Sequence, residues 1–90
     1  MKDYKKEILG NICYTELVYD RINKKLNIDF SKEEIEKMIY DLIEETDKKK
    51  FQKKGKNIYI TNECRNIRLT VNSFTNRIIT ADRLNKKTTK

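Results

Sequence analysis

The C-terminal half of the chain concentrates cationic and hydrogen-bonding side chains of the kind that bind phosphate. Residues 48–90 carry thirteen Lys or Arg against only Glu63 and Asp82, a net charge of +11. Residues 1–47 carry eight Lys or Arg against twelve Asp or Glu, a net charge of −4. A segment with so little acidic relief attracts polyanions. The charge distribution therefore predicts a partner that carries phosphate.

The polar residues of this half alternate with apolar ones, which is the period of a β-strand. We predict that the apolar positions share the buried face of a sheet and that the polar positions share the other face. The expected polar face contains Tyr59, Thr61, Arg68, Thr70, Asn72 and either Thr80 or Arg77. Arginine would pair with phosphate, Asn and Thr would hydrogen-bond base or sugar, and Tyr59 would stack on a base. The alternative is that this face is merely solvated, as in many antiparallel sheets.

A glycine flanked by lysines lies in the segment from Lys53 to Asn57, at the expected entry to the first strand. Glycine lets backbone N–H groups approach an anion, and ammonium groups such as that of Lys56 neutralise it. The segment is not a P-loop, because the spacing GxxxxGK[ST] is absent. The alternative interpretation of the lysines from Lys48 to Lys56 is a solvated hinge that follows a helix.

Helices are predicted in the N-terminal half. Ser31 and Glu34 form the pattern of a capping box, and apolar residues then recur at helical spacing to about Asp47. A second helix is expected from about Thr15 to Leu26, and a short one from about Asp3 to Leu9.

These elements predict an α+β fold, a two-layer sandwich in which the N-terminal helices pack on a C-terminal three-stranded antiparallel meander. We expect one domain over residues 1–84 and a basic, disordered tail over residues 85–90. Because the core is small and the charge is high, a homo-oligomer, most simply a homodimer, is expected.

The composition argues against several classes of site. Cys13 and Cys64 lie far apart, and the chain contains no histidine, so neither a zinc site nor any other metal or cofactor is expected. The cysteines are interpreted as small buried hydrophobes in a reducing compartment. No apolar run reaches the length of a membrane span, so we expect a cytoplasmic protein with no membrane partner.

Five short phrases occur in order between about residues 12 and 82. They are C-Y-T-E-L from Cys13, R-I from Arg21, G-K-N-I-Y-I from Gly55, T-V-N-S from Thr70 and I-I-T-A from Ile78. Together they resemble a family of small, uncharacterised bacterial and phage proteins, a domain of unknown function. This chain has Ile58 where that family often has Trp, and Asp82-Arg83 where a His can follow. The resemblance implies no activity, but it points to the polar members of its motifs: Thr15, Glu16, Arg21, Lys56, Asn57, Tyr59, Thr70 and Asn72.

Three functions fit these observations. The leading hypothesis is a non-enzymatic protein that binds a nucleic acid or a signalling nucleotide. The binding residues would be Lys56, Asn57, Tyr59, Arg68, Thr70, Asn72 and Arg77. By analogy with other small phage proteins, such a protein could serve a phage in counter-defence. A possible second cluster is Thr15, Glu16 and Arg21. One alternative is a protein–protein inhibitor or antitoxin-like module. The other is a small ribonuclease toxin that uses Tyr59, Glu63, Arg68 and Arg77, which the scarcity of carboxylates in the strand half disfavours.

Overall fold

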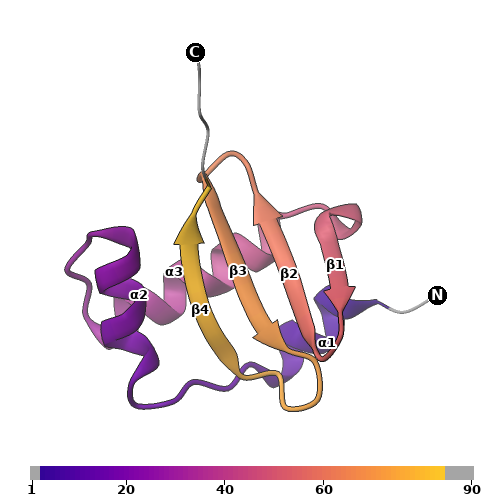
Figure 1. Cartoon of the computed structure of the whole chain (residues 1–90), viewed down its shortest axis with the longest axis horizontal. Helices are drawn as coiled ribbons and strands as arrows, with labels where there is room; N and C mark the ends of the chain where they lie inside the picture. Colours follow the sequence, from indigo (N-terminus) through magenta and orange to yellow (C-terminus); the bar gives the residue numbers. More distant parts are fainter. Residues whose placement is uncertain (1–2, 85–90) are drawn as a thin grey trace.

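The computed structural model describes residues 3–84 of the chain. Three helices come first, α1 (Tyr4–Asn11), α2 (Val18–Leu26) and α3 (Lys32–Glu45), followed by the 3-10 turn η1 (Lys48–Lys50). Four strands complete the fold: β1 (Phe51–Lys54), β2 (Asn57–Asn62), β3 (Ile67–Asn72) and β4 (Ile78–Arg83) (Figure 1). The predicted α+β class is therefore confirmed. The tail predicted over residues 85–90 lies outside the described residues.

Helix α3 begins as its sequence predicts. The Ser31 hydroxyl accepts a hydrogen bond from the Glu34 amide at 3.2 Å, and the Glu34 carboxylate accepts one from the Ser31 amide at 2.8 Å. These two bonds satisfy backbone donors that the first turn of a helix leaves free. The apolar stripe that follows is buried at Ile35, Ile39, Leu42 and Ile43.

The sheet is antiparallel throughout and has the order β1-β2-β3-β4. The prediction of three strands was wrong, because Phe51–Lys54 forms a fourth strand at the edge. Its sequence has one apolar residue followed by Gln and two lysines, a composition that is equally typical of the solvated hinge considered as the alternative. In the structure Phe51 is buried opposite Ile60, and lysines are common on edge strands, where they discourage pairing with other chains.

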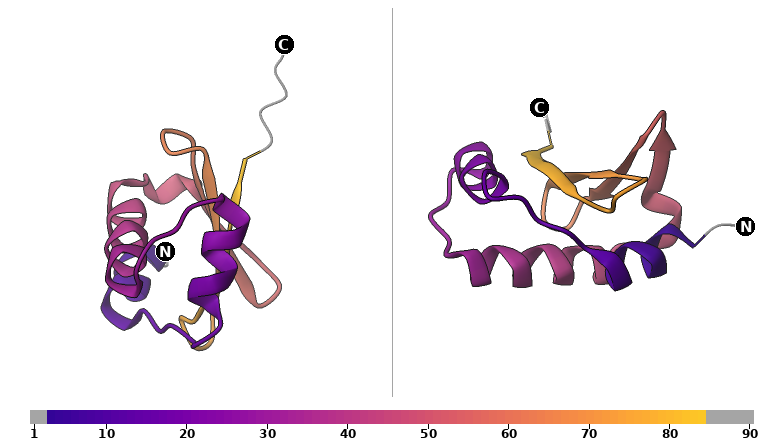
Figure 2. Two further views of the ribbon diagram at one scale, coloured as in Figure 1. Left: turned by 90° about the vertical axis from the view of Figure 1, so that its left-hand side faces the viewer. Right: turned by 90° about the horizontal axis from the view of Figure 1, so that it is seen from below.

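Two helices, not all three, form the second layer. Helices α1 and α3 lie behind the sheet in Figure 1, whereas α2 lies beside β4 at the edge of the sheet (Figure 2). The linker before α2 explains this position. The Cys13 amide donates to the Asn76 carbonyl at 2.9 Å, and the Ile78 amide donates to the Cys13 carbonyl at 2.8 Å. These bonds hold the linker against the start of β4 and bring α2 to that edge.

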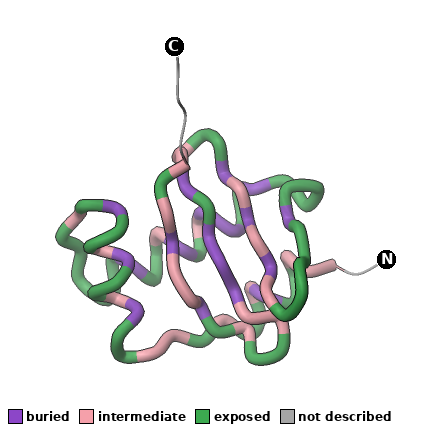
Figure 3. Tube along the Cα trace, in the orientation of Figure 1, coloured by how far each residue is buried: buried purple, intermediate pink, exposed green. Residues whose placement is uncertain are grey.

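The core lies between the sheet and the helices. It buries Ile8 of α1, the Val18, Ile22 and Leu26 stripe of α2, the α3 stripe, and the inward residues of the strands. These inward residues are Phe51, Ile58, Ile60, Ile67, Leu69, Val71, Ile78 and Ala81. The alternation predicted for β2 is visible in Figure 3 as buried positions separated by more exposed ones. In β3 the alternation is interrupted at Thr70, which is buried like its neighbours Leu69 and Val71. The interpretation of the cysteines as buried was wrong, since Cys13 and Cys64 are both free thiols on the surface.

A β-bulge settles which residues of the last strand face inward. Val71 pairs with Ile78 and Thr70 pairs with Thr80, so Ile79 is the extra residue of the bulge. Ile78 is therefore the buried member of the Ile78–Ile79 pair, and Thr80 lies on the polar face while Arg77 precedes the strand.

Candidate functional site

The sheet turns one face away from α1 and α3, and this open face is toward the viewer in Figure 1. Strand register defines its rows. Tyr59 pairs with Gln52 on one side and with Thr70 on the other, and Arg68 pairs with Thr61 and Asp82. We use "open face" for these residues together with Lys54, Asn57, Asn72 and Thr80.

A hollow of about 260 Å³ lies on the open face over β1, β2 and β3. We call it the Arg68 hollow. Among the described residues its lining is polar and cationic and contains no carboxylate: Gln52, Lys54, Tyr59, Thr61 and Arg68. Two of these five residues come from β1, the strand that the sequence interpretation missed.

Arg68 and Tyr59 lie against each other in this hollow. The guanidinium carbon of Arg68 is 5.7 Å from the centre of the Tyr59 ring, within the range of a cation–π contact. Arg68 is exposed and Tyr59 is half-buried, so the contact orients the guanidinium without removing it from solvent. Among residues 3–84, neither Arg68 nor Lys54 forms a salt bridge.

The carboxylate nearest in register to Arg68 is already neutralised. Asp82 pairs with Arg68 across the two strands, but its carboxylate lies 3.2 Å from the Lys25 ammonium of α2. Because Lys25 offsets the charge of Asp82, the positive charge of Arg68 is left available to a ligand.

Residues 6–82 match the family described as "Protein of unknown function (DUF3781)". The chain belongs to the DUF3781 family. No curated protein and no solved structure matches it significantly. The expected membership of a domain-of-unknown-function family is thus confirmed, and the matched range includes every residue of the Arg68 hollow. The bacterial or phage origin and the individual motif phrases stay predictions.

In this DUF3781 protein the predicted binding residues fall into two groups. Tyr59 and Arg68 line the hollow, whereas Lys56 and Arg77 lie in the turns at the other end of the sheet. These turns are joined by a bond of 2.8 Å from the Ser73 amide to the Lys56 carbonyl. Gly55 has a φ of 62°, which suits the first position of a two-residue hairpin loop. Gly55 and Lys56 therefore form the β1–β2 hairpin loop, and the Lys53–Asn57 segment is not the entry to the first strand of the sheet.

Three further residues that were predicted to bind a ligand are buried, half-buried or engaged in a turn. Thr70 is only 7% exposed and cannot present its hydroxyl to a large ligand. The Asn72 side-chain oxygen accepts the backbone amides of Phe74 and Thr75 at 2.8 and 3.2 Å, which builds the β3–β4 turn. Asn57 is half-buried opposite Asn72 and Lys54 at the turn end.

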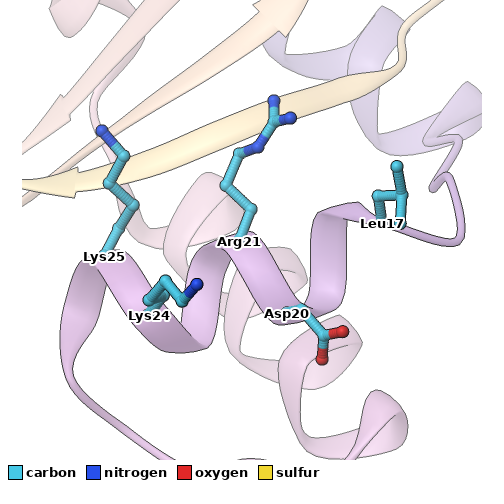
Figure 4. Close-up of a pocket in the computed structure, with 5 residues that line it drawn as sticks. All are labelled: Leu17, Asp20, Arg21, Lys24 and Lys25. Carbon is cyan, nitrogen blue, oxygen red and sulfur yellow. The ribbon is translucent and has the colours of Figure 1, made fainter.

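The second predicted cluster is not brought together. Glu16 forms a salt bridge of 3.2 Å with Lys32 of α3, whereas Arg21 reaches the carbonyl of Ile79 in β4 at 3.4 Å. Thr15 lies in the linker, where its carbonyl accepts the Val18 amide at 3.2 Å. Arg21 instead lines a hollow of about 370 Å³ with Leu17, Asp20, Lys24 and Lys25 (Figure 4).

An aromatic cluster that sequence reasoning missed joins α2 to α3. The rings of Tyr14 and Tyr19 stack with centres 5.7 Å apart, and the Tyr19 hydroxyl donates to the Glu36 carboxylate at 2.6 Å. Burial, together with this bond, raises the pKa of Tyr19 to about 12. Lys32 lies 5.3 Å from the Tyr19 ring centre. The cluster holds the two helices together, which is a structural role.

The residues considered for a ribonuclease do not converge. Glu63 lies in the turn between β2 and β3, where its carboxylate is 3.5 Å from the Lys50 ammonium. Arg77 lies in the turn between β3 and β4, at the other end of β3. Tyr59 and Arg68 lie between the two. Among residues 3–84 no helix is long and apolar enough to cross a membrane.

Proposed function

We propose that this protein binds a phosphate-bearing ligand, a nucleotide or a nucleic acid, on the open face of its sheet and does not act as an enzyme. The observation that carries the proposal is the Arg68 hollow. Lys54 and Arg68 line it beside an aromatic ring, and within residues 3–84 neither cation has a carboxylate partner.

Each side chain of the hollow suits one part of such a ligand. The Arg68 guanidinium can donate two parallel hydrogen bonds to a phosphate, and Lys54 adds a mobile point charge. Gln52 and Thr61 offer donors and acceptors for a base or sugar, and Tyr59 offers a ring for stacking. Among residues 3–84 no carboxylate lines the hollow to serve as a general base, which favours binding over acid–base chemistry.

The rest of the molecule supports binding at this face. The acidic residues belong mostly to the helical half, and α1 and α3 lie on the opposite side of the sheet (Figure 2). An approaching anion therefore meets the basic strands before it meets the acidic helices. A homo-oligomer and a phage counter-defence role stay predictions that this geometry does not address.

Calorimetric titration with ATP at low salt tests the proposal. We expect Arg68→Ala to weaken ATP binding at least about tenfold, because the loss of even one charge-assisted hydrogen bond costs about 1.5 kcal/mol. Arg68 is exposed, so the variant should keep the wild-type circular dichroism spectrum.

Lys37→Ala is the matched control for this titration. This substitution removes one positive charge, as Arg68→Ala does, but from α3. The Lys37 side chain is 78% exposed there and pairs with Asp41. Equal affinities of the two variants would show that binding follows net charge and not the hollow. If ATP does not bind the wild type at all, the protein-partner alternative takes precedence, with the acidic helices as the docking surface.

A further inference from the structure

We propose, resting on the function proposed above, that the ligand is a single-stranded nucleic acid that runs across several strands of the sheet. A mononucleotide would occupy the Arg68 hollow alone. The structure places further polar hollows and cations on both sides of it, and their spacing favours a polymer.

The first observation is that the Arg68 hollow continues toward η1. A second hollow of about 330 Å³ is lined by Lys49, Lys50, Phe51, Gln52 and Thr61. Gln52 and Thr61 line both hollows, so the two share a wall and form one continuous surface. Lys50 is paired with Glu63, but Lys49 forms no salt bridge among the described residues.

The second observation is the separation of the backbone positions that carry the cations. Lys54 of β1 pairs with Asn57 of β2, and Arg68 of β3 pairs with Thr61 of β2. Lys54 and Arg68 are therefore separated by two strand spacings across the sheet and by four residues along β2. With neighbouring strands about 4.8 Å apart and a rise of about 3.3 Å per residue, their Cα atoms lie about 16 Å apart. The Cα atom of Lys49 lies at most about 14 Å from that of Lys54, the sum of the rises along η1 and β1. Lys54 and Arg68 both line one hollow, so a single nucleotide can contact both, whereas Lys49 lines the next hollow and is reached by a polymer whose phosphates are separated by sugars.

The third observation is that cations also flank the opposite edge of the sheet. Arg21 and Lys25 of α2 point across β4 in Figure 4, and Lys24 lies beside them while Asp20 points away. Arg21 is held by the Ile79 carbonyl and Lys25 by Asp82. A nucleic acid that leaves the Arg68 hollow over β4 therefore passes the Lys25–Asp82 ion pair and then meets Arg21 and Lys24 of α2.

Tyr59 favours a single strand over a duplex. Its ring, with the Arg68 guanidinium against it, is the aromatic platform of the face. Bases can stack on an aromatic ring or on an arginine plane only when they are unpaired and splayed. A duplex keeps its bases stacked on one another and would contact only the cations.

Fluorescence anisotropy with labelled oligonucleotides tests the inference. The probes are uridine and thymidine oligomers of about twelve nucleotides, a uridine oligomer of about three, a duplex of about twelve base pairs, and ATP as competitor. We expect both long single strands to bind alike and at least tenfold more tightly than the short oligomer or ATP. With phosphate contacts from Lys49, Lys54 and Arg68 alone, affinity should fall at least about 20-fold between about 50 and about 200 mM salt.

Single-residue variants locate the bound nucleic acid on the sheet. Lys49→Ala and Arg68→Ala should each reduce the slope of log affinity against log salt by about 0.7, and Lys37→Ala should leave it unchanged. Lys49→Ala should leave ATP affinity within twofold of wild type, because Lys49 lies outside the Arg68 hollow.

Three results would overturn the inference. If the long oligomers bind no more tightly than ATP, while ATP binding still depends on Arg68, the polymer is excluded and the proposed function stands. If neither ATP nor any oligomer binds, both proposals fail. If the duplex binds as tightly as the single strands, the role assigned to Tyr59 is wrong.

Discussion

Asn62 shows how one buried polar side chain can join two elements. It is 4% exposed at the end of β2, and its amide group donates to the Thr46 hydroxyl at 2.9 Å and to the Glu45 carboxylate at 3.0 Å. Its side-chain oxygen accepts the Arg65 amide at 2.8 Å. Asn62 thus ties the end of α3 to the β2–β3 turn, and a buried polar group is stable only with such partners.

Replacing Asn62 by Ala should lower the free energy of unfolding by about 1–3 kcal/mol, because Thr46 and the Arg65 amide lose partners. Urea unfolding measures the change. Asn57→Ala, a half-buried position at the other end of the same strand, serves as the control and should cost less than about 1 kcal/mol. Equal losses in the two variants would contradict the role assigned to Asn62.

At the scale of elements, the end of α3 is fixed by charge as well. Arg65 of the β2–β3 turn contacts both carboxylate oxygens of Glu45, with its Nε at 2.7 Å and its Nη2 at 3.2 Å. The Arg65 guanidinium, followed by the Asn62 amide, lowers the pKa of Glu45 below its ordinary value of 4.5. The ion pair is partly exposed, so its stabilising effect is modest.

This contact gives stability a dependence on pH. Because the pKa of Glu45 is lower in the folded than in the unfolded chain, its contribution is complete above about 4.5 and is lost as the pH falls through the folded value. The melting temperature of Glu45→Gln should therefore fall less steeply than that of wild type on acidification from about pH 6 to about pH 3. Parallel curves for the two proteins would show that the contact does not shift this carboxylate.

The elements also show what the sequence can predict. The cap and stripe of α3 and the alternation in β2 and β3 are local patterns, so these elements and their buried faces are predicted well. β1 contains one apolar residue, and its pairing with β2 depends on a tertiary contact of Phe51. The position of α2 depends on hydrogen bonds between the Cys13 linker and β4, which no local pattern indicates.

The same limit applies to the candidate site. Alternation places Tyr59 and Arg68 on one face, but Gln52 and Lys54 could be added only once β1 was known. Thr70 shares that face and is nevertheless covered, because the alternation reports direction and not the size of neighbouring side chains. The sequence predicts ligand binding by Asn72 because the residue is polar. A polar residue is equally expected there because its side chain caps the tight β3–β4 turn.

At the scale of the whole molecule, the fold separates charge by layer. The strand half carries the net positive charge, and the acidic α3 lies behind the sheet (Figure 1). Salt bridges between the halves, such as Arg65–Glu45 and Lys48–Asp3, lie outside the Arg68 hollow. The cations in the hollow are therefore left without partners from the described helices, and this is the physical basis of the proposed binding.

Mapping backbone amide chemical shifts during titration with ATP tests this account most directly, because it locates binding without altering any residue. The account predicts that the largest shifts occur at Gln52, Lys54, Tyr59, Thr61 and Arg68, and that the amides of α3 around Lys37 barely move. Largest shifts on α1 or α3, or in the turns that carry Lys56 and Arg77, would contradict it.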